Sequence, residues 1–142
     1  MKVFSNSAIS LDGRINTRDD RPVVLGSKKD LQTMASLRAQ ADAVLIGGAT
    51  FRHWPLPLVG NAQSPARPIW NIVVTRRLDM QLRAKYLQDA RIRPLFLAPV
   101  DAARADFPAE VQTYAGPGRD LPISWILEVL AQRGIKTLLV EA

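Results

Sequence analysis

The sequence predicts a single α/β domain in which a mostly parallel sheet is flanked by helices. Short, nearly continuous apolar runs, which are typical of strands buried on both faces, alternate with segments of helical periodicity. Several of these runs end in glycine or in polar residues, as in the stretch ADAVLIGGATFR at residues 41–52. At 142 residues, 47% of them hydrophobic, the chain is long enough to bury a core of this kind. We therefore take residues 1–142 as one domain.

The first half of the chain predicts a helix between strands. The first strand covers residues 2–9 and runs into SLDGR, where Asp12-Gly13 marks a turn, and a short apolar stretch follows at 23–25. A helix begins at Ser27, because Asp30 three positions later resembles a capping box. Leu31, Met34 and Leu37 form the apolar face of this helix, and the next strand covers residues 43–46.

The second half predicts further strands and one more helix. The strands are expected at 69–74, 94–98, 111–115 and 136–142, the helix at 121–134, and a proline-rich surface loop at 55–68. Asp120 is the candidate N-cap of that helix, and Gly134 ends it. The run KTLLVEA, which ends the sequence, has the composition of an interior strand that needs neighbours on both sides.

The composition excludes several classes of site. The sequence has no cysteine and one histidine, so thiolate or histidine-rich metal sites and a cysteine nucleophile are excluded. No apolar run approaches the roughly 20 residues that span a bilayer, and no signal-peptide pattern begins the chain, so we expect a cytoplasmic protein. The net charge of +6 favours anionic partners. We expect a phosphorylated metabolite and no nucleic acid, because the basic residues are scattered and aromatic residues make up 6%.

Polar residues follow three of the predicted strands. They are Gly47 to Arg52, Thr75 to Arg77, and Glu141. In parallel α/β sheets, ligands bind outside the carboxyl ends of the strands. Three strand ends that carry polar groups are more than turn formation requires, so this edge is the predicted ligand site.

Each of these groups has a simple structural alternative. Gly47 and Gly48 could free backbone amides for an anion, with Thr50 as a further donor, or they could form a tight turn; no P-loop or G-x-G-x-x-G pattern follows them. Arg76 and Arg77 could bind a monoester phosphate or could be two solvated side chains.

The remaining candidates are open in the same way. Arg38 near a helix end is explained by the helix dipole, and Glu141 near the end of the sequence could belong to a frayed terminus. Glu141 could instead bind the N–H groups of a heterocycle. Asp12 and Arg14 flank a glycine, a pattern that most often indicates a turn. Substrate binding is the less frequent alternative.

Five motifs in order resemble a known family. They are ISLDGRI (9–15), LGS (25–27), LRAQADAVLIGGATFR (37–52), PIWNIVVTRRL (68–78) and RGIKTLLVEA (133–142). Together they resemble the reductase domain of the riboflavin-biosynthesis deaminase/reductase, which has a dihydrofolate-reductase-like fold. The resemblance covers essentially the whole chain. It implies an NADPH-dependent reductase that converts the ribosyl group of 5-amino-6-(5-phosphoribosylamino)uracil to ribityl, and a homodimer.

The resemblance also implies roles for individual residues. Cofactor contacts are implied for Ala8, Gly47, Gly48 and Thr50, and contacts to the 2′-phosphate region for Thr75, Arg76 and Arg77. Arg38 is implied to face the phosphate of the substrate, and Glu141 its pyrimidine ring; Asp12 and Arg14 are further substrate candidates. Because the nicotinamide supplies the hydride, the resemblance implies no catalytic side chain and no metal.

Two departures from the family pattern bear on these expectations. Where the family carries an acidic residue before Asn-Pro or Asp-Pro, this chain has Arg52-His53-Trp54-Pro55. The sequence also ends at Ala142, before the glycine-rich loop that binds the cofactor pyrophosphate in the family. We therefore expect an unpaired apolar edge at 136–142, and three explanations stay open: a fragment, a chain completed by a partner, or a shortened homologue without turnover. A non-catalytic nucleotide-binding module and a pterin or other pyrimidine reductase are the alternative functions.

Overall fold

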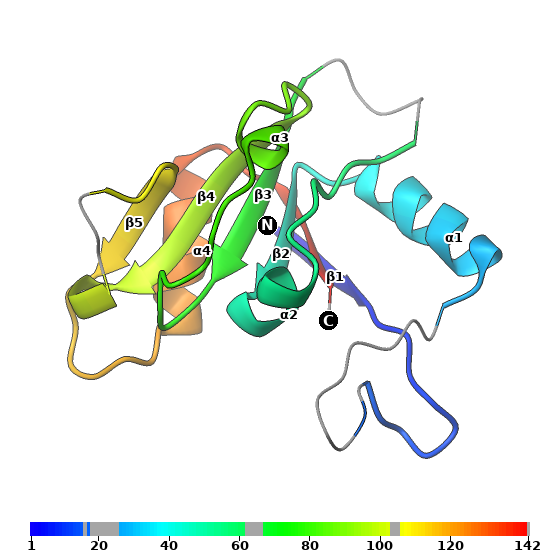
Figure 1. The fold of residues 1–142 in the computed structure, drawn as a ribbon, viewed down its shortest axis with the longest axis horizontal. Helices are drawn as coiled ribbons and strands as arrows, with labels where there is room; N and C mark the ends of the chain where they lie inside the picture. Colours follow the sequence, from blue (N-terminus) through cyan, green and yellow to red (C-terminus); the bar gives the residue numbers. More distant parts are fainter. Residues whose placement is uncertain (16, 18–25, 62–66, 103–105, 142) are drawn as a thin grey trace.

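The computed structural model describes residues 1–15, 17, 26–61, 67–102 and 106–141 (Figure 1). Within this part of the chain, six strands form one sheet in the order β1-β6-β2-β3-β4-β5. Every neighbouring pair is parallel, which confirms the predicted α/β class. The strands are β1 (Lys2–Asn6), β2 (Ala43–Gly47), β3 (Ile69–Val74), β4 (Ile92–Pro99), β5 (Glu110–Tyr114) and β6 (Thr137–Glu141).

Helices connect these strands and cover the sheet. They are α1 (Lys28–Arg38), α2 (Gly48–His53), α3 (Ala84–Leu87), the 3-10 helix η1 (Val100–Ala102) and α4 (Ile123–Gln132). In Figure 1, α4 lies behind the sheet, whereas α2 and α3 lie in front of it. The arrowheads of β3 and β4 point to the lower part of the view, where α2 also lies, so the carboxyl edge of the sheet is there.

The strands are apolar on both faces because each face has its own core. Alternate residues point to opposite sides of a strand, so Val44 and Val73 enter one core while Ala43 and Ile72 enter the other. Phe51 of α2 and Tyr86 of α3 pack into the first core, and Ile126, Val129 and Leu130 of α4 pack into the second. Burial on both faces explains the near-continuous apolar runs in the sequence.

The last strand has a neighbour on each side. Leu138 of β6 is the register partner both of Val3 in β1 and of Ala43 in β2. The predicted interior strand is thus confirmed as Thr137–Glu141; residue 142 lies outside the described residues. The expectation of an unpaired edge there is wrong, because β1 occupies the position beside β6; the edges of the described sheet are β1 and β5.

The predicted helix ends were partly correct. The Ser27 hydroxyl accepts a hydrogen bond from the Asp30 N–H at 3.3 Å, which confirms the start of α1. Gly134 follows α4 with a φ of +73°, the left-handed conformation that favours glycine after a helix. Asp120 does not cap α4, because Pro122 occupies the N-cap and the Asp120 carboxylate pairs with Arg76.

Other predicted boundaries also changed. β1 ends at Asn6 and not at residue 9, and β4 is longer than predicted. α1 contains the three residues of the predicted apolar face, but within Lys28–Arg38 no residue is buried, and Leu31 of that face is 58% exposed. The apolar stretch at 23–25 lies outside the described residues.

Asn71 fixes the proline-rich loop to the sheet. It is fully buried in β3, where its side-chain oxygen accepts from the Leu58 N–H at 2.8 Å and its amide donates to the Leu58 carbonyl at 3.0 Å. The donor and the acceptor of the Asn71 side chain therefore both have a partner in the backbone of Leu58, as burial of a polar group requires.

Tyr86 leaves a polar atom inside the first core. Its ring packs edge-on against Phe51 at a centroid distance of 5.1 Å, and the side chain is 1% exposed. Among the described residues its hydroxyl has no hydrogen-bond partner, and burial raises the pKa of the phenol well above its ordinary value.

We predict that Tyr86→Phe leaves the free energy of unfolding unchanged or raises it by about 1 kcal/mol, because an unsatisfied buried hydroxyl is removed. The folded-state pKa lies above the unfolded value of about 10, so the stabilising effect of the neutral phenol is complete below that pH and is lost as the pH rises above it. Urea unfolding at pH 8 and 10.5 should show a smaller alkaline loss in the variant. A marked loss of stability in Tyr86→Phe at pH 8 would instead mean that the hydroxyl has a partner.

Candidate functional site

The candidate site lies at the carboxyl ends of β6, β2 and β3, which are neighbours in the sheet. Glu141 ends β6, Gly47 ends β2, and Thr75 follows β3. The three polar groups that the sequence placed at strand ends therefore meet along one edge, as expected for a parallel sheet.

The two glycines of this edge have different environments. A Cβ atom at Gly48 would lie 2.4 Å from the Thr75 hydroxyl oxygen and 2.6 Å from its Cβ, so glycine is required for close packing of α2 on β3. At Gly47, a Cβ would meet nothing within 4 Å, and the residue is exposed. Gly48 is thus explained by packing, whereas the backbone at Gly47 is open to a ligand.

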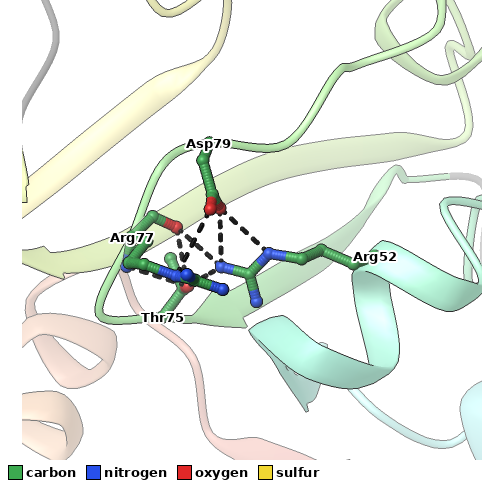
Figure 2. Close-up of polar contacts among 4 residues, drawn as sticks. All are labelled: Arg52, Thr75, Arg77 and Asp79. Carbon is green, nitrogen blue, oxygen red and sulfur yellow. Dashed lines mark hydrogen bonds and ion pairs between the residues drawn. The ribbon is translucent and has the colours of Figure 1, made fainter.

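The loop after β3 is held by a polar network (Figure 2). The buried Thr75 hydroxyl donates to the Arg77 carbonyl at 2.8 Å and accepts from the Arg77 N–H at 3.2 Å. The Arg52 side chain reaches this loop from α2, where Nη2 donates both to the Thr75 hydroxyl and to the Arg77 carbonyl at 3.2 Å. The hydroxyl of Thr75 therefore has a structural role in closing the turn.

Asp79 completes the network. Its Oδ1 accepts from Arg52 Nε at 3.0 Å, and its Oδ2 lies 3.3 Å from Arg77 Nε. The hydrogen bond from Arg52 is the main cause that lowers the pKa of Asp79 below its usual range. The carboxylate therefore stays ionised at neutral pH, and the arginine side chains of the network keep their partner.

Arg76 leaves the same loop in another direction and lines a cleft of about 280 Å³. Residues from the segment before α4 form the other wall, including Arg119 and Asp120. Arg76 Nη2 lies 2.5 Å from Asp120 Oδ1, and Arg119 Nε lies 2.7 Å from Asp101 Oδ2. The cleft thus presents two guanidinium groups, each of which is held by an exposed carboxylate.

Arg38 and Glu141 form a bidentate ion pair. Arg38 Nε and Nη2 donate to the two carboxylate oxygens of Glu141, each at 2.7 Å. The side chains are 17% and 6% exposed, so Glu141 does not lie in a frayed terminus. The structure brings the two predicted substrate residues together, and in this state each neutralises the other.

Asp12 and Arg14 belong to a turn that is closed by its own residues. Their side chains form an ion pair at 3.0 Å and are more than half exposed. The Ser10 N–H donates to the Arg14 carbonyl at 2.8 Å, and the Ser10 hydroxyl donates to the Asp12 carboxylate. Gly13 at the turn has a φ of +77°. These contacts confirm the predicted turn, which projects away from the sheet in Figure 1.

The remaining predicted cofactor residues lie near the same edge without a resolved role. Ala8 is half-buried in the segment that follows β1, and Thr50 is half-buried within α2. The Thr50 carbonyl accepts from the Trp54 N–H at 2.9 Å, which ends that helix. Cofactor contacts by these two residues stay predictions.

A second, smaller cleft of about 110 Å³ lies at the amino edge of the sheet and is lined by three arginines. Arg67 pairs there with Asp42, Arg133 pairs with Glu110 at 2.7 Å, and Arg93 lies over the ring of Trp70. These partners account for the three arginines. Arg133 is also the C-cap of α4, where a cation is favoured by the helix dipole.

Sequence reasoning placed Arg52 among the polar residues of the ligand edge without a role of its own, gave no role to Asp79 or Arg119, and assigned Asp120 to a helix cap. The cation at Arg52 stood out in the sequence because it follows the glycine pair, but its partners come from a loop more than 20 residues away. Among the described residues, no three His, Cys, Asp or Glu side chains are arranged to hold a metal ion. In the same part of the chain, no helix is long and apolar enough to cross a membrane.

We predict that Gly48→Ala lowers the free energy of unfolding by about 1–3 kcal/mol, because the new methyl group must displace Thr75 from its packed position. Gly47→Ala is the matched control, since its backbone is extended and its Cβ would lie in open space; its effect should stay within about 0.5 kcal/mol. Urea unfolding monitored by circular dichroism measures both. Equal losses in the two variants would contradict this account of the glycine pair.

We predict that Arg38→Met and Glu141→Gln each cost about 3 kcal/mol of stability, because each leaves a largely buried charge without its partner. The double variant should cost less than the sum of the two by more than about 1 kcal/mol. A double-mutant cycle by urea unfolding measures this coupling. Additive losses would show that the ion pair contributes nothing beyond the packing of each side chain.

The comparisons with known proteins agree with this architecture. The chain is 30% identical, over an alignment of 154 positions, to the 2,5-diamino-6-ribosylamino-4(3H)-pyrimidinone 5′-phosphate reductase of Archaeoglobus fulgidus, with 98% of this chain and 68% of that protein covered. Two solved structures share its fold with a TM-score of 0.76 over 99% of this chain. One is a diaminohydroxyphosphoribosylaminopyrimidine deaminase/5-amino-6-(5-phosphoribosylamino)uracil reductase from Thermotoga maritima, 20% identical, and the other is Acinetobacter baumannii RibD, 23% identical.

This chain spans 38% and 39% of the length of those two solved chains. At such identities the likeness establishes the fold, which is the dihydrofolate-reductase-like α/β fold predicted from the sequence. The family itself is shown by its sequence profile, which matches all of residues 1–142. The chain therefore belongs to the RibD C-terminal domain family, a family of pyrimidine reductases.

Proposed function

We propose that this protein is an NADPH-dependent reductase of riboflavin biosynthesis that converts the ribosyl group of 5-amino-6-(5-phosphoribosylamino)uracil to ribityl. The observation that carries the proposal is the cleft beside Thr75 and Arg76, which opens at the carboxyl edge of the sheet, where β2 ends at the open backbone of Gly47. Membership of the family supports the reductase class.

The residues of this edge fit a dinucleotide cofactor with a 2′-phosphate. The guanidinium groups of Arg76 and Arg119 line one cleft, and such groups suit a monoester phosphate because they present donors in a fixed planar fork. The absence of a side chain at Gly47 would let a ligand approach the strand end closely. When bound at this edge, a nicotinamide would supply the hydride for C1′ of the ribosyl group, and a proton would be taken up by the ring oxygen as the ring opens.

Arg38 and Glu141 would bind the substrate. An arginine offers donors to a phosphate, and a carboxylate accepts hydrogen bonds from the N–H groups of a pyrimidine. The archaeal relative is named for a substrate with an amino group at position 2 of the ring. This diamino pyrimidinone is therefore the second candidate substrate, and Glu141 would accept from its N–H groups in the same way.

One observation favours a different function, which is nucleotide binding without turnover. Arg38 and Glu141 satisfy each other in a bidentate pair that is nearly buried, so the substrate half of the site is closed in this state. A protein that binds NADPH but reduces neither pyrimidine would match this alternative.

We predict that Arg76→Ala combined with Arg77→Ala weakens NADPH binding by about 10-fold or more, since a hydrogen bond to a charged group contributes about 1.5–3 kcal/mol. Binding of NADH, which has no 2′-phosphate, should change by less than about 3-fold. Fluorescence titration of both cofactors measures the ratio. Of the single variants, Arg76→Ala should have the larger effect, because Arg76 lines the cleft whereas Arg77 pairs with Asp79.

Arg91→Ala is the control for the loss of positive charge. It removes an arginine that pairs with Asp89 at 2.7 Å before β4, at the other edge of the sheet. Equal losses for NADPH and NADH in the double variant would refute the phosphate assignment. Turnover of each pyrimidine phosphate, followed by NADPH absorbance, then separates the reductase from the binding module.

A further inference from the structure

We propose that Arg52, anchored by Asp79, is a positioning residue that fixes the loop 75–79 so that Arg76 faces the cofactor phosphate. This inference rests on the proposed function, because it concerns how the same cleft selects its ligand. Arg52 does not line the cleft, and its effect is exerted through the backbone on both sides of Arg76.

The contacts of Arg52 enclose the position of Arg76. One nitrogen, Nη2, donates to the Thr75 hydroxyl and to the Arg77 carbonyl, so the residues before and after Arg76 are tied to the same atom. The Thr75 hydroxyl and Arg77 are in turn joined by two hydrogen bonds of 2.8 and 3.2 Å. Figure 2 shows this network of Arg52, Thr75, Arg77 and Asp79, which fixes the loop on both sides of Arg76.

The geometry requires an arginine at position 52. Its Nε donates to Asp79 Oδ1 at 3.0 Å, and Nη2, which lies 2.9 Å from the same oxygen, also donates to the loop, so one planar group binds three acceptors. A lysine has a single nitrogen on a flexible stem and cannot reproduce this fork. The Arg52 side chain is 27% exposed and Asp79 is 48% exposed, so Arg52 is the less exposed partner of a pair at the surface.

Gly48 leaves the space that this network of Arg52 and Thr75 occupies. A Cβ at this position would lie 2.4 Å from the Thr75 hydroxyl oxygen and 3.3 Å from Arg52 Nη1, so a side chain would intrude where the two groups meet. The glycine pair therefore has two separate functions. Gly48 makes room for the network, and Gly47 leaves the strand end open.

The network also separates two neighbouring arginines. Arg77 turns back to Asp79, whereas Arg76 extends to Asp120 in the wall of the cleft. If the loop relaxed, the side chain of Arg76 would no longer be held toward that cleft, and the preference for a phosphorylated cofactor would fall. General binding of the dinucleotide would change less, because the open backbone of Gly47 is unaffected.

The test compares Arg52→Met, Arg52→Lys and Asp79→Asn with the matched control Arg91→Met, which removes another arginine that is paired with an aspartate. The Kd values for NADPH and NADH are measured by titration, and amide hydrogen exchange is followed at residues 75–79. For Arg52→Met we expect NADPH affinity to fall about 10-fold with NADH affinity changed by less than about 3-fold. Arg52→Lys should not restore the wild-type ratio of NADPH affinity to NADH affinity. Amide hydrogen exchange at residues 75–79 should be faster than in the wild type in both Arg52→Met and Arg52→Lys.

Asp79→Asn keeps an oxygen that accepts from Arg52 Nε but removes the negative charge. It should therefore lower the ratio of NADPH affinity to NADH affinity by less than Arg52→Met does, and its thermal unfolding should be little changed. It carries the test if Arg52→Met does not fold. An unchanged NADPH to NADH ratio in Arg52→Lys and Asp79→Asn, in a wild-type chain that binds NADPH, would overturn this inference alone. A wild-type chain that binds neither cofactor would overturn the proposed function and this inference together.

Discussion

The parallel pairing of β6 between β1 and β2 is the constraint on which the rest of the structure depends. Residues 137–141 pair with 2–6 on one side, and residues 138–140 pair with 43–45 on the other, so the first and last strands lie side by side, with β1 at the edge of the sheet and β6 inside it. This pairing brings Glu141 to the same edge as Gly47 and Thr75. It also keeps the apolar residues Leu138, Leu139 and Val140 away from the sheet edge, where unpaired backbone groups promote association.

A close approach between α2 and β3 then shapes the candidate site at that edge. Because Gly48 has no side chain, Thr75 packs against the start of α2 and Arg52 reaches over to the loop. Packing and polar positioning are therefore coupled at one residue. The same arrangement explains why a glycine pair can follow a buried strand without forming a phosphate-binding loop of the usual sequence.

The sequence predicted the elements of this fold well and their partners poorly. Strand periodicity identified 69–74 and 43–46, and the Ser27 pattern identified the start of α1, because these signals are local. The neighbour of β6 could not be read from the sequence, since β1 lies more than 130 residues earlier. The ion pair of Arg38 with Glu141 and the contacts of Arg52 were missed for the same reason, and Asp120 was misplaced because its partner Arg76 is 44 positions away.

The charged residues of the candidate site bind each other, so the proposed binding of an anion would be an exchange of partners. Arg76 and Asp120 are 69% and 86% exposed, and an ion pair of this kind contributes at most about 1 kcal/mol, so a phosphate would replace the carboxylate at little cost. Arg38 and Glu141 are 17% and 6% exposed, and breaking such a pair leaves two charges that need new partners. A ligand that carries a phosphate for Arg38 and N–H donors for Glu141 satisfies both at once. A phosphate alone or a free pyrimidine satisfies one and leaves the other uncompensated, so selectivity for a phosphorylated ribosylaminopyrimidine would follow from the pair itself.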